Sequence, residues 1–118
     1  MRCGLDVLLS SPARLNELRG ARVGLLAHAA SVTALFEHAI EALARAGVQV
    51  VRLFGPEHGI RGEAQDMIAV GGAVDPISRI PTVSLYGTTL ASLTPRQDDL
   101  RDLDVMLIDL QDVGARYY

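Results

Sequence analysis

The chain has 118 residues, which suits one domain with a substantial hydrophobic core and is too short for two ordinary domains. Its composition is globular, with 49% hydrophobic and 21% charged residues, and its net charge at pH 7 is −3. The 11 basic residues are all arginines, scattered along the chain. Binding to nucleic acid or to an anionic membrane needs clustered positive charge, so we expect neither function.

The single Cys3 has no second cysteine with which to form an internal disulfide, which favours a reducing compartment. Residues 1–12 lack the basic start and apolar core of a signal peptide, and no apolar run approaches membrane-spanning length. We therefore expect a cytoplasmic protein if Met1 is the native start.

Helical signals occupy two parts of the first half of the chain. Residues 5–19 predict a short helical lead-in that a proline interrupts. From 32 to 44 the apolar residues recur with the spacing of a helix that buries one face. Ser31 or Thr33 is expected to cap the start of this second helix, and Gly47 its end.

Four apolar runs, at 23–27, 48–54, 82–86 and 104–110, predict strands. The sequence TPRQ, which begins at Thr94, matches a capping box and predicts a short helix to about residue 101. Strands that alternate with helical or loop segments favour right-handed crossovers and a mostly parallel sheet. We therefore predict an α/β, Rossmann-like three-layer fold. Neither the dinucleotide fingerprint nor a P-loop occurs in the sequence, so we expect no nucleotide cofactor and no metal.

Residues 55–81 form a long connection rich in glycine, and connections of that length inside a compact domain are usually functional. The connection begins inside the segment FGPEHGIRG, at 54–62, where residues that transfer protons are unusually dense. Loops with Gly and Pro are more often only turns. The residues that follow the other predicted strands therefore indicate whether this segment is only a turn or part of a functional site.

Polar residues capable of chemistry follow three of the four predicted strands. His28 follows the first strand, Glu57 and His58 follow the second, and Asp109, Gln111 and Asp112 end or follow the fourth. Ligands of open parallel sheets bind beyond the carboxyl ends of the strands. These residues therefore predict one site at that edge of the sheet.

The segments LFGPEHGIRGEAQ, SLYG and DVMLIDLQDVGARYY resemble the NamZ-type exo-β-N-acetylmuramidases, a family of glycoside hydrolases. The resemblance implies release of terminal N-acetylmuramic acid from the non-reducing ends of peptidoglycan fragments. It also implies that residues 1–118 are a truncated N-terminal catalytic domain, whose cleft faces a second, C-terminal domain that is absent here. Family members usually carry Asn where His28 stands, so we expect a different substrate contact at that position.

Glycoside hydrolysis needs an acid that protonates the leaving oxygen and a second group that activates water or attacks the sugar. Glu57 is the candidate acid, with a surface ion pair to Arg61 as the alternative. Asp109 is the candidate second carboxylate, and a structural hydrogen bond to a neighbouring loop is an equal alternative. His58 or Arg61 would adjust the pKa of Glu57.

Further candidate contacts to the sugar carry weaker signals. Gln111 suits a hydroxyl or acetamido group, or simply holds its loop, and Tyr86 suits stacking on a sugar face or half-buried packing. Asp112 and Arg116 are four residues apart, which favours an ordinary ion pair. The predicted substrate-binding set is His28, His58, Arg61, Gln111, Asp112, Arg116 and Tyr86. His38 is expected to be solvated on the polar face of the 32–44 helix.

Two other functions remain open on the sequence. A metal-dependent hydrolase would use Glu57, His58, Glu63, Asp109 and Asp112 as ligands, although no recognised ligand spacing is present. A non-catalytic module would bind a muropeptide or sugar without turnover. Because the fourth strand has no crossover helix after it, we also expect these 118 residues to be inactive alone and to self-associate.

Overall fold

A computed structural model gives the architecture and describes residues 2–56, 59–61 and 74–114. In chain order the elements are α1 (Gly4–Leu9), α2 (Pro12–Glu17), β1 (Val23–Ala27), α3 (Ala39–Arg45), β2 (Val50–Gly55), β3 (Thr82–Ser84), the 3-10 helix η1 (Leu90–Leu93), α4 (Gln97–Leu100) and β4 (Val105–Asp109). Within these described ranges, no helix has the length and apolar character needed to cross a membrane.

The four strands form one sheet in the order β3-β2-β1-β4, and every neighbouring pair is parallel. Leu25 at the centre of β1 lies beside Leu53 of β2 on one side and Leu107 of β4 on the other. This order is typical of one half of a Rossmann fold, in which the chain moves outward from the first strand and then returns to its other side. The predicted α/β fold with a parallel sheet is confirmed. Three of the strands lie within the predicted runs, and β2 ends at Gly55, one residue beyond its predicted run.

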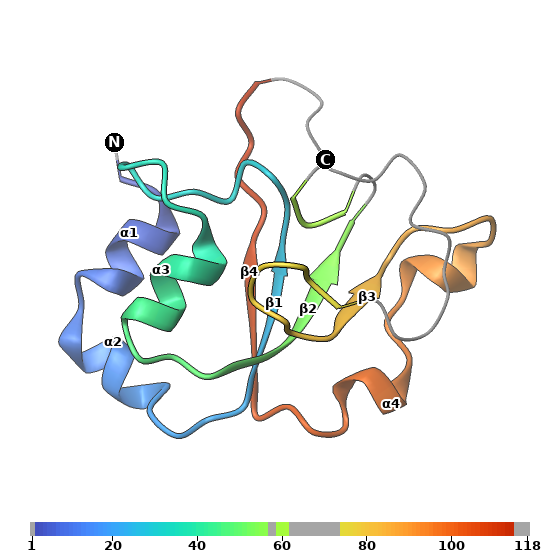
Figure 1. Cartoon of the computed structure of the whole chain (residues 1–118), viewed down its shortest axis with the longest axis horizontal. Coiled ribbons are helices and arrows are strands. Elements are labelled where there is room, and N and C mark those ends of the chain that lie inside the picture. Colours follow the sequence, from blue (N-terminus) through green and yellow to red (C-terminus); the bar gives the residue numbers. More distant parts are fainter. Residues whose placement is uncertain (1, 57–58, 62–73, 115–118) are drawn as a thin grey trace.

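Helices α1, α2 and α3 cover one face of the sheet, and the segment that carries η1 and α4 lies on the other side (Figure 1). The main core lies under the three helices, where Leu25 and Leu53 meet Ile40 and Leu43 of α3. All four side chains are buried. Burying an aliphatic side chain of this size contributes about 1.5–3 kcal/mol, so this layer fixes α3 against β1 and β2.

The opposite face of β1 is packed around Gly24. A Cβ atom at this position would lie 2.6 Å from Leu103 Cδ1, 2.9 Å from Met106 Sδ and 3.2 Å from a ring carbon of Phe54. Only glycine lets these three side chains close over the middle of the sheet. The short connection through α4 therefore packs directly against the strand backbone.

The helix predicted over 32–44 begins later than expected, at Ala39. Residues 32–38 form a turn closed by an antiparallel bridge between Val32 and His38. The Thr33 hydroxyl accepts hydrogen bonds from the backbone N–H groups of Leu35 and Glu37, at 3.3 and 3.2 Å. Such local side-chain bonds compete with helical ones, so they end the helical pattern here.

Two further consequences follow for this segment. Leu35 and Phe36, predicted to lie on the buried face, are 86% and 87% exposed, and Phe36 has a φ of 61°. The cap of α3 is His38, whose Nδ1 accepts from the Ile40 N–H at 3.3 Å, and neither Ser31 nor Thr33 serves. The predicted end is confirmed, because Gly47 follows the C-cap with a φ of 80°.

Helix α4 also begins later than its capping signal. The N-cap is Arg96, and its backbone N–H donates to the Asp99 carboxylate at 3.1 Å. Thr94 therefore lies outside the helix, and the reciprocal bond forms two residues further along the chain than predicted. Asp99 is a stronger acceptor than the amide of Gln97, which explains the shift.

Candidate functional site

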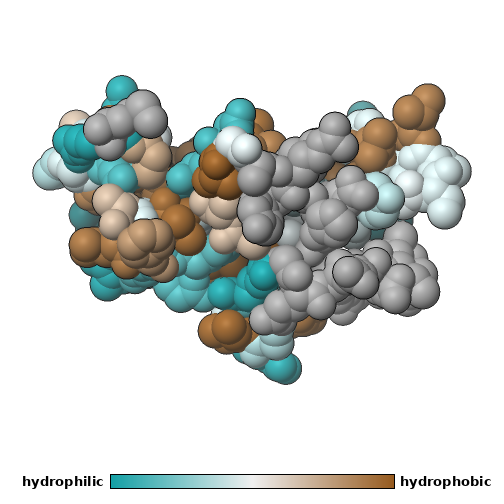
Figure 2. Space-filling view, turned by 90° about the horizontal axis from the view of Figure 1, so that it is seen from above, coloured by the Kyte–Doolittle hydropathy of each residue, from teal (hydrophilic) through white to brown (hydrophobic). Residues whose placement is uncertain are grey.

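The carboxyl ends of β1 and β4 are neighbours in the sheet, and the strand order reverses between these two strands. The connection from β1 to β2 runs through α3 on one face, and the connection from β3 to β4 runs through α4 on the other (Figure 1). This is a topological switch point, the place where open parallel sheets bind ligands. Figure 2 looks onto the molecule from above, and among its coloured residues hydrophilic and hydrophobic ones lie side by side.

Asp109, the last residue of β4, lies at this switch point opposite Ala27 of β1. Both of its carboxylate oxygens accept hydrogen bonds from Gln111 Nε2, at 3.1 and 3.3 Å. The same amide donates to the Val32 carbonyl at 2.9 Å, which ties the end of β4 to the turn before α3. The hydrogen bonds from Gln111 therefore fix the orientation of the Asp109 carboxylate.

His28, the residue after β1, lies beneath this cluster and is 4% exposed. Its Nδ1 accepts the Ala30 N–H at 3.0 Å. Burial lowers the pKa of His28 below its ordinary value, although the nearby Asp109 carboxylate opposes that shift. We expected a substrate contact here, but so buried a ring offers almost no surface to a ligand.

Ser31 and His38 belong to the same cluster and were not among the predicted site residues. Ser31 is fully buried, and its Oγ donates to the Asp109 carbonyl. His38 Nε2 lies 3.0 Å from the His28 carbonyl oxygen, so the expectation of a solvated His38 is wrong. The turn at 32–38 buries these two side chains. In the sequence, only Thr33 indicated that such a turn could form here.

Arg61 is held by two carboxylates of the chain. Its Nε and one terminal nitrogen bind Asp75 at 2.7 and 3.0 Å, and the same terminal nitrogen binds Glu41 of α3 at 2.6 Å. This guanidinium holds the pKa of Asp75 well below its usual range. The alternative ion pair between Glu57 and Arg61 stays untested, because Glu57 lies outside the described residues; the described partners of Arg61 are Asp75 and Glu41.

The segment that enters the predicted Glu57 turn is tightly packed. A Cβ atom on Gly55 would lie 3.0 Å from the Ile60 nitrogen and 3.2 Å from Gly59 Cα, so only glycine fits there. Gly59 N–H donates to the Pro56 carbonyl at 3.0 Å, and Ile60 is buried. Glu57 and His58 lie outside the described residues.

The remaining predicted contacts lie further apart. Tyr86 follows β3, is 46% exposed and lies at the opposite edge of the sheet from β4. Three strand spacings separate those edges, about 14 Å. Asp112 is exposed and accepts the Gly114 N–H at 2.8 Å. Its expected partner Arg116 lies outside the described residues, and no metal-binding group of three ligands occurs among the residues that are described.

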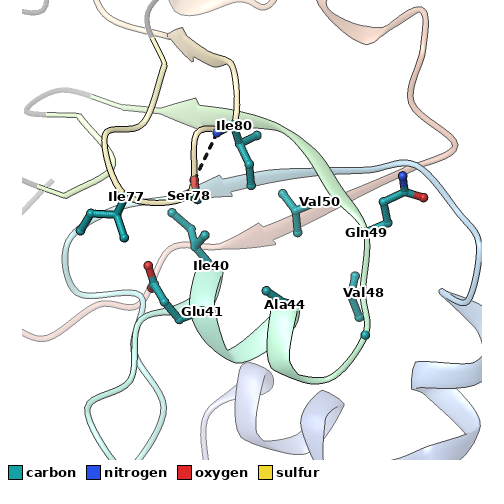
Figure 3. A pocket seen from close by; sticks show the side chains of 10 residues that line it. Ile40, Glu41, Ala44, Val48, Gln49, Val50, Ile77, Ser78 and Ile80 are labelled. Carbon is teal, nitrogen blue, oxygen red and sulfur yellow. Dashed lines mark hydrogen bonds between the residues drawn. The ribbon is translucent and has the colours of Figure 1, made fainter.

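A groove of about 560 Å³ lies on the helix-covered face, between α3, the start of β2 and the turn at 77–80 (Figure 3). Its lining is mostly apolar: Ile40, Ala44, Val48, Val50, Ile77 and Ile80, with Glu41, Ser78 and Gln49 as the polar side chains. Val48 and Val50 lie at the amino end of β2, whereas Asp109 lies at the carboxyl end of β4. It brings together none of the predicted site residues.

The fold and this cluster define an α/β protein of Rossmann order with a polar site at the switch point of its sheet. The chain belongs to the family described as exo-β-N-acetylmuramidase NamZ, N-terminal, which it matches over residues 23–118. It is 36% identical over 119 residues to the peptidoglycan β-N-acetylmuramidase NamZ of Bacillus subtilis (strain 168).

Two crystal structures of DUF1343 family proteins from Bacteroides fragilis NCTC 9343 resemble the fold. One matches 98% of this chain with a TM-score of 0.77 and 34% identity, and the other matches 92% with a TM-score of 0.66 and 25% identity. The chain spans 28% of the B. subtilis protein and 27% and 26% of the two B. fragilis chains. It therefore corresponds to about a quarter of its relatives' length.

Proposed function

We propose that the protein is a glycoside hydrolase that releases terminal N-acetylmuramic acid from the non-reducing end of peptidoglycan fragments. Family membership supports the class of reaction. The observation that supports this placement of the site is the oriented Asp109 carboxylate at the switch point. Only β1 lies between it and the end of β2, the strand that precedes Glu57.

The sheet register supports a pairing of the two carboxyls. Ala27 lies beside Asp109, and the residue before it lies beside Phe54, so Gly55 and Asp109 stand level across β1. Two strand spacings separate them, about 10 Å between backbones. The working carboxyls of glycosidases lie roughly 5–10 Å apart, depending on mechanism, and Glu57 follows Gly55 by two residues in the sequence.

In this proposal Glu57 protonates the leaving oxygen, and Asp109 activates water or attacks the anomeric carbon. The hydrogen bonds from Gln111 suit the ionised form of Asp109, which the second role requires. We assign the contacts to the sugar to His58, Asp112, Arg116 and Tyr86. Arg61 holds the far end of the Glu57 segment against α3 through Glu41 and Asp75.

The test is hydrolysis of a disaccharide with terminal N-acetylmuramic acid by the protein at its natural length. Glu57→Gln should lower kcat by several orders of magnitude and change KM little, because the carboxyl proton is used only in the transition state. The matched control is Glu17→Gln, on the exposed surface of α2. A Glu57→Gln variant with near-normal kcat would remove Glu57 from the mechanism.

Two further experiments distinguish this proposal from a metal-dependent hydrolase and from a sugar-binding module. Loss of activity on treatment with EDTA would favour a metal-dependent hydrolase, whereas the glycosidase mechanism proposed here should be insensitive to it. A sugar-binding module would bind the disaccharide without turnover even in the unsubstituted protein. We expect the 118 residues alone to bind weakly and to be inactive, since they represent about a quarter of the relatives' length.

A further inference from the structure

The imidazole of His28 makes a hydrogen bond that only its neutral form can make. Nδ1 accepts the N–H of Ala30, two residues further along the chain, at 3.0 Å. Nδ1 must therefore carry no proton, which places the single ring proton on Nε2. An Asn side chain makes the same bond to the residue two positions on when it closes a turn. His28 thus closes the turn after β1.

This turn is connected to Asp109 through Ser31. The His28 N–H donates to Ser31 Oγ at 3.0 Å, and Ser31 N–H donates back to the His28 carbonyl at 2.9 Å. Ser31 Oγ in turn donates its one proton to the Asp109 carbonyl. The serine is fully buried, so no water replaces these bonds if the turn opens.

A second connection runs through Gln111. The N–H of Val32 donates to the Ala30 carbonyl at 2.9 Å, and the Gln111 side chain donates to the Val32 carbonyl at 2.9 Å. The same Gln111 amide donates to both oxygens of the Asp109 carboxylate. The turn that His28 closes is therefore connected to both residues that fix Asp109: Ser31 holds its backbone, and Gln111 holds its carboxylate.

We propose that His28 is a positioning residue for Asp109, which it holds through Ser31 and Gln111 only while its ring is neutral. The inference rests on the proposed function in so far as Asp109 takes part in the reaction. Protonation would convert Nδ1 from an acceptor into a donor facing the Ala30 N–H. The turn would then open, and both connections to Asp109 would loosen.

The charged groups around His28 decide when that happens. The Asp109 carboxylate at the end of β4 favours the charged ring, and His38 at the start of α3 disfavours it. Burial is the largest influence, and the net effect is a pKa below the ordinary 6.5. The unfolded chain therefore binds a proton before the folded chain does, so stability falls as the pH drops below 6.5 toward the lower, folded-state pKa.

The first test uses nuclear magnetic resonance on the 118-residue chain. The nitrogen shifts of His28 should report a neutral ring protonated on Nε2, and the backbone amides of Ala30, Ser31 and Gln111 should shift together at its titration midpoint. In His28→Asn the same amides should keep their neutral-pH positions and lose this titration. The matched control, His38→Asn, should keep it.

Either of two results would overturn the inference at this stage. One is a His28 ring protonated on Nδ1. The other is a titration of His28 that leaves the amides of Ser31 and Gln111 unmoved.

The second test is the pH profile of disaccharide hydrolysis by the protein at its natural length. The acid limb of kcat should contain the midpoint of His28, and His28→Asn should remove that part of the limb. His28→Ala should lower kcat by at least about tenfold with a smaller change in KM, because Asp109 loses its orientation while the sugar still binds. Normal kcat in His28→Ala, verified as folded, would refute the positioning role.

The two proposals fail separately. If the unsubstituted protein hydrolyses no disaccharide, the proposed function is wrong, and the amide titration still decides whether His28 holds Asp109. If hydrolysis occurs and His28→Asn keeps the whole acid limb, the positioning role is wrong and the proposed function stands.

Discussion

Asp75→Asn should be the most damaging single isosteric change in the described part of the chain. The Asp75 side chain is 1% exposed and accepts four hydrogen bonds. Two come from Arg61, and two come from the backbone N–H and hydroxyl of Ser78, both at 2.7 Å. The asparagine keeps the shape and removes the charge, so it leaves the buried guanidinium of Arg61 with Glu41 alone.

The size of the effect follows from that geometry. Breaking a buried ion pair by removing one partner costs about 3–5 kcal/mol. Glu41 remains 2.6 Å from Arg61 and is partly exposed, which places the loss at the lower end, about 3 kcal/mol. For a domain of this length that corresponds to a melting temperature about 10 °C lower.

Urea unfolding at neutral pH measures this loss, with Asp104→Asn as the matched control. Asp104 also binds an arginine, Arg22, through both carboxylate oxygens, but the two side chains are 44% and 50% exposed. An exposed pair contributes little to stability, so the control should barely move the unfolding midpoint. Equal losses in the two variants would refute the claim that the Arg61–Asp75 pair is a buried structural contact.

The same pair predicts a pH dependence with a definite sign. Arg61 holds the folded-state pKa of Asp75 well below its ordinary 3.8, so the unfolded chain takes up a proton first as the pH falls. The stabilisation is complete above 3.8 and is lost below it. The unfolding free energies of the native chain and Asp75→Asn should therefore converge in acid, and a constant difference would contradict this assignment.

Two further outcomes test the packing of the sheet. Gly24→Ala should destabilise the chain by about 1–3 kcal/mol in urea unfolding, because its methyl group collides with three side chains, whereas Gly4→Ala meets nothing within 4 Å; equal stability of the two variants would contradict the close packing. The exposed edge of β4, where Ile108 is 67% exposed, should make the 118 residues self-associate. Light scattering should show this and Ile108→Lys should reduce it, and a monomeric native chain would contradict the expectation.

The strands were predictable because each is a separate, short apolar run in the sequence. β1 and β4 were predicted as strands from Val23 and Val105 onward, and the structure places both there. β1 is buried, but β4 lies at the edge of the described sheet and is only half-buried, so the expectation of a central fourth strand is wrong for the described residues. It was not predictable that β1 and β4 are adjacent in the sheet, because strand order depends on which face of the sheet each crossover connection covers. The sequence of the connections before Val50 and Val105 does not encode that choice locally.

The helix at 32–44 shows where periodicity misleads. Leu35 and Phe36 fall on the apolar face of the helical pattern, but the Thr33 hydroxyl and the His38 cap hold the chain in a turn instead. From the sequence, Thr33 was predicted as one possible cap of the helix, and the turn that it closes was not predicted. Local hydrogen bonds prevailed over the pattern.

The candidate site was predictable as a place and only partly as a set of residues. Asp109 and Gln111 follow from the rule that ligands bind at the carboxyl ends of parallel strands. Ser31 did not, because its role depends on burial between two strands that are distant in sequence. His28 was predicted at the correct edge, but only the structure shows that it is buried and that Ala30 occupies its Nδ1.

The most direct test of this account is to map where N-acetylmuramic acid binds, by titrating the sugar into the isotopically labelled 118-residue chain and following its backbone amides. The account predicts that the shifts concentrate at the carboxyl edge, at residues 28–31, 55–61 and 109–112. Shifts confined to the groove between α3 and the turn at 77–80 would contradict it, because they would place the sugar on a different face of the molecule.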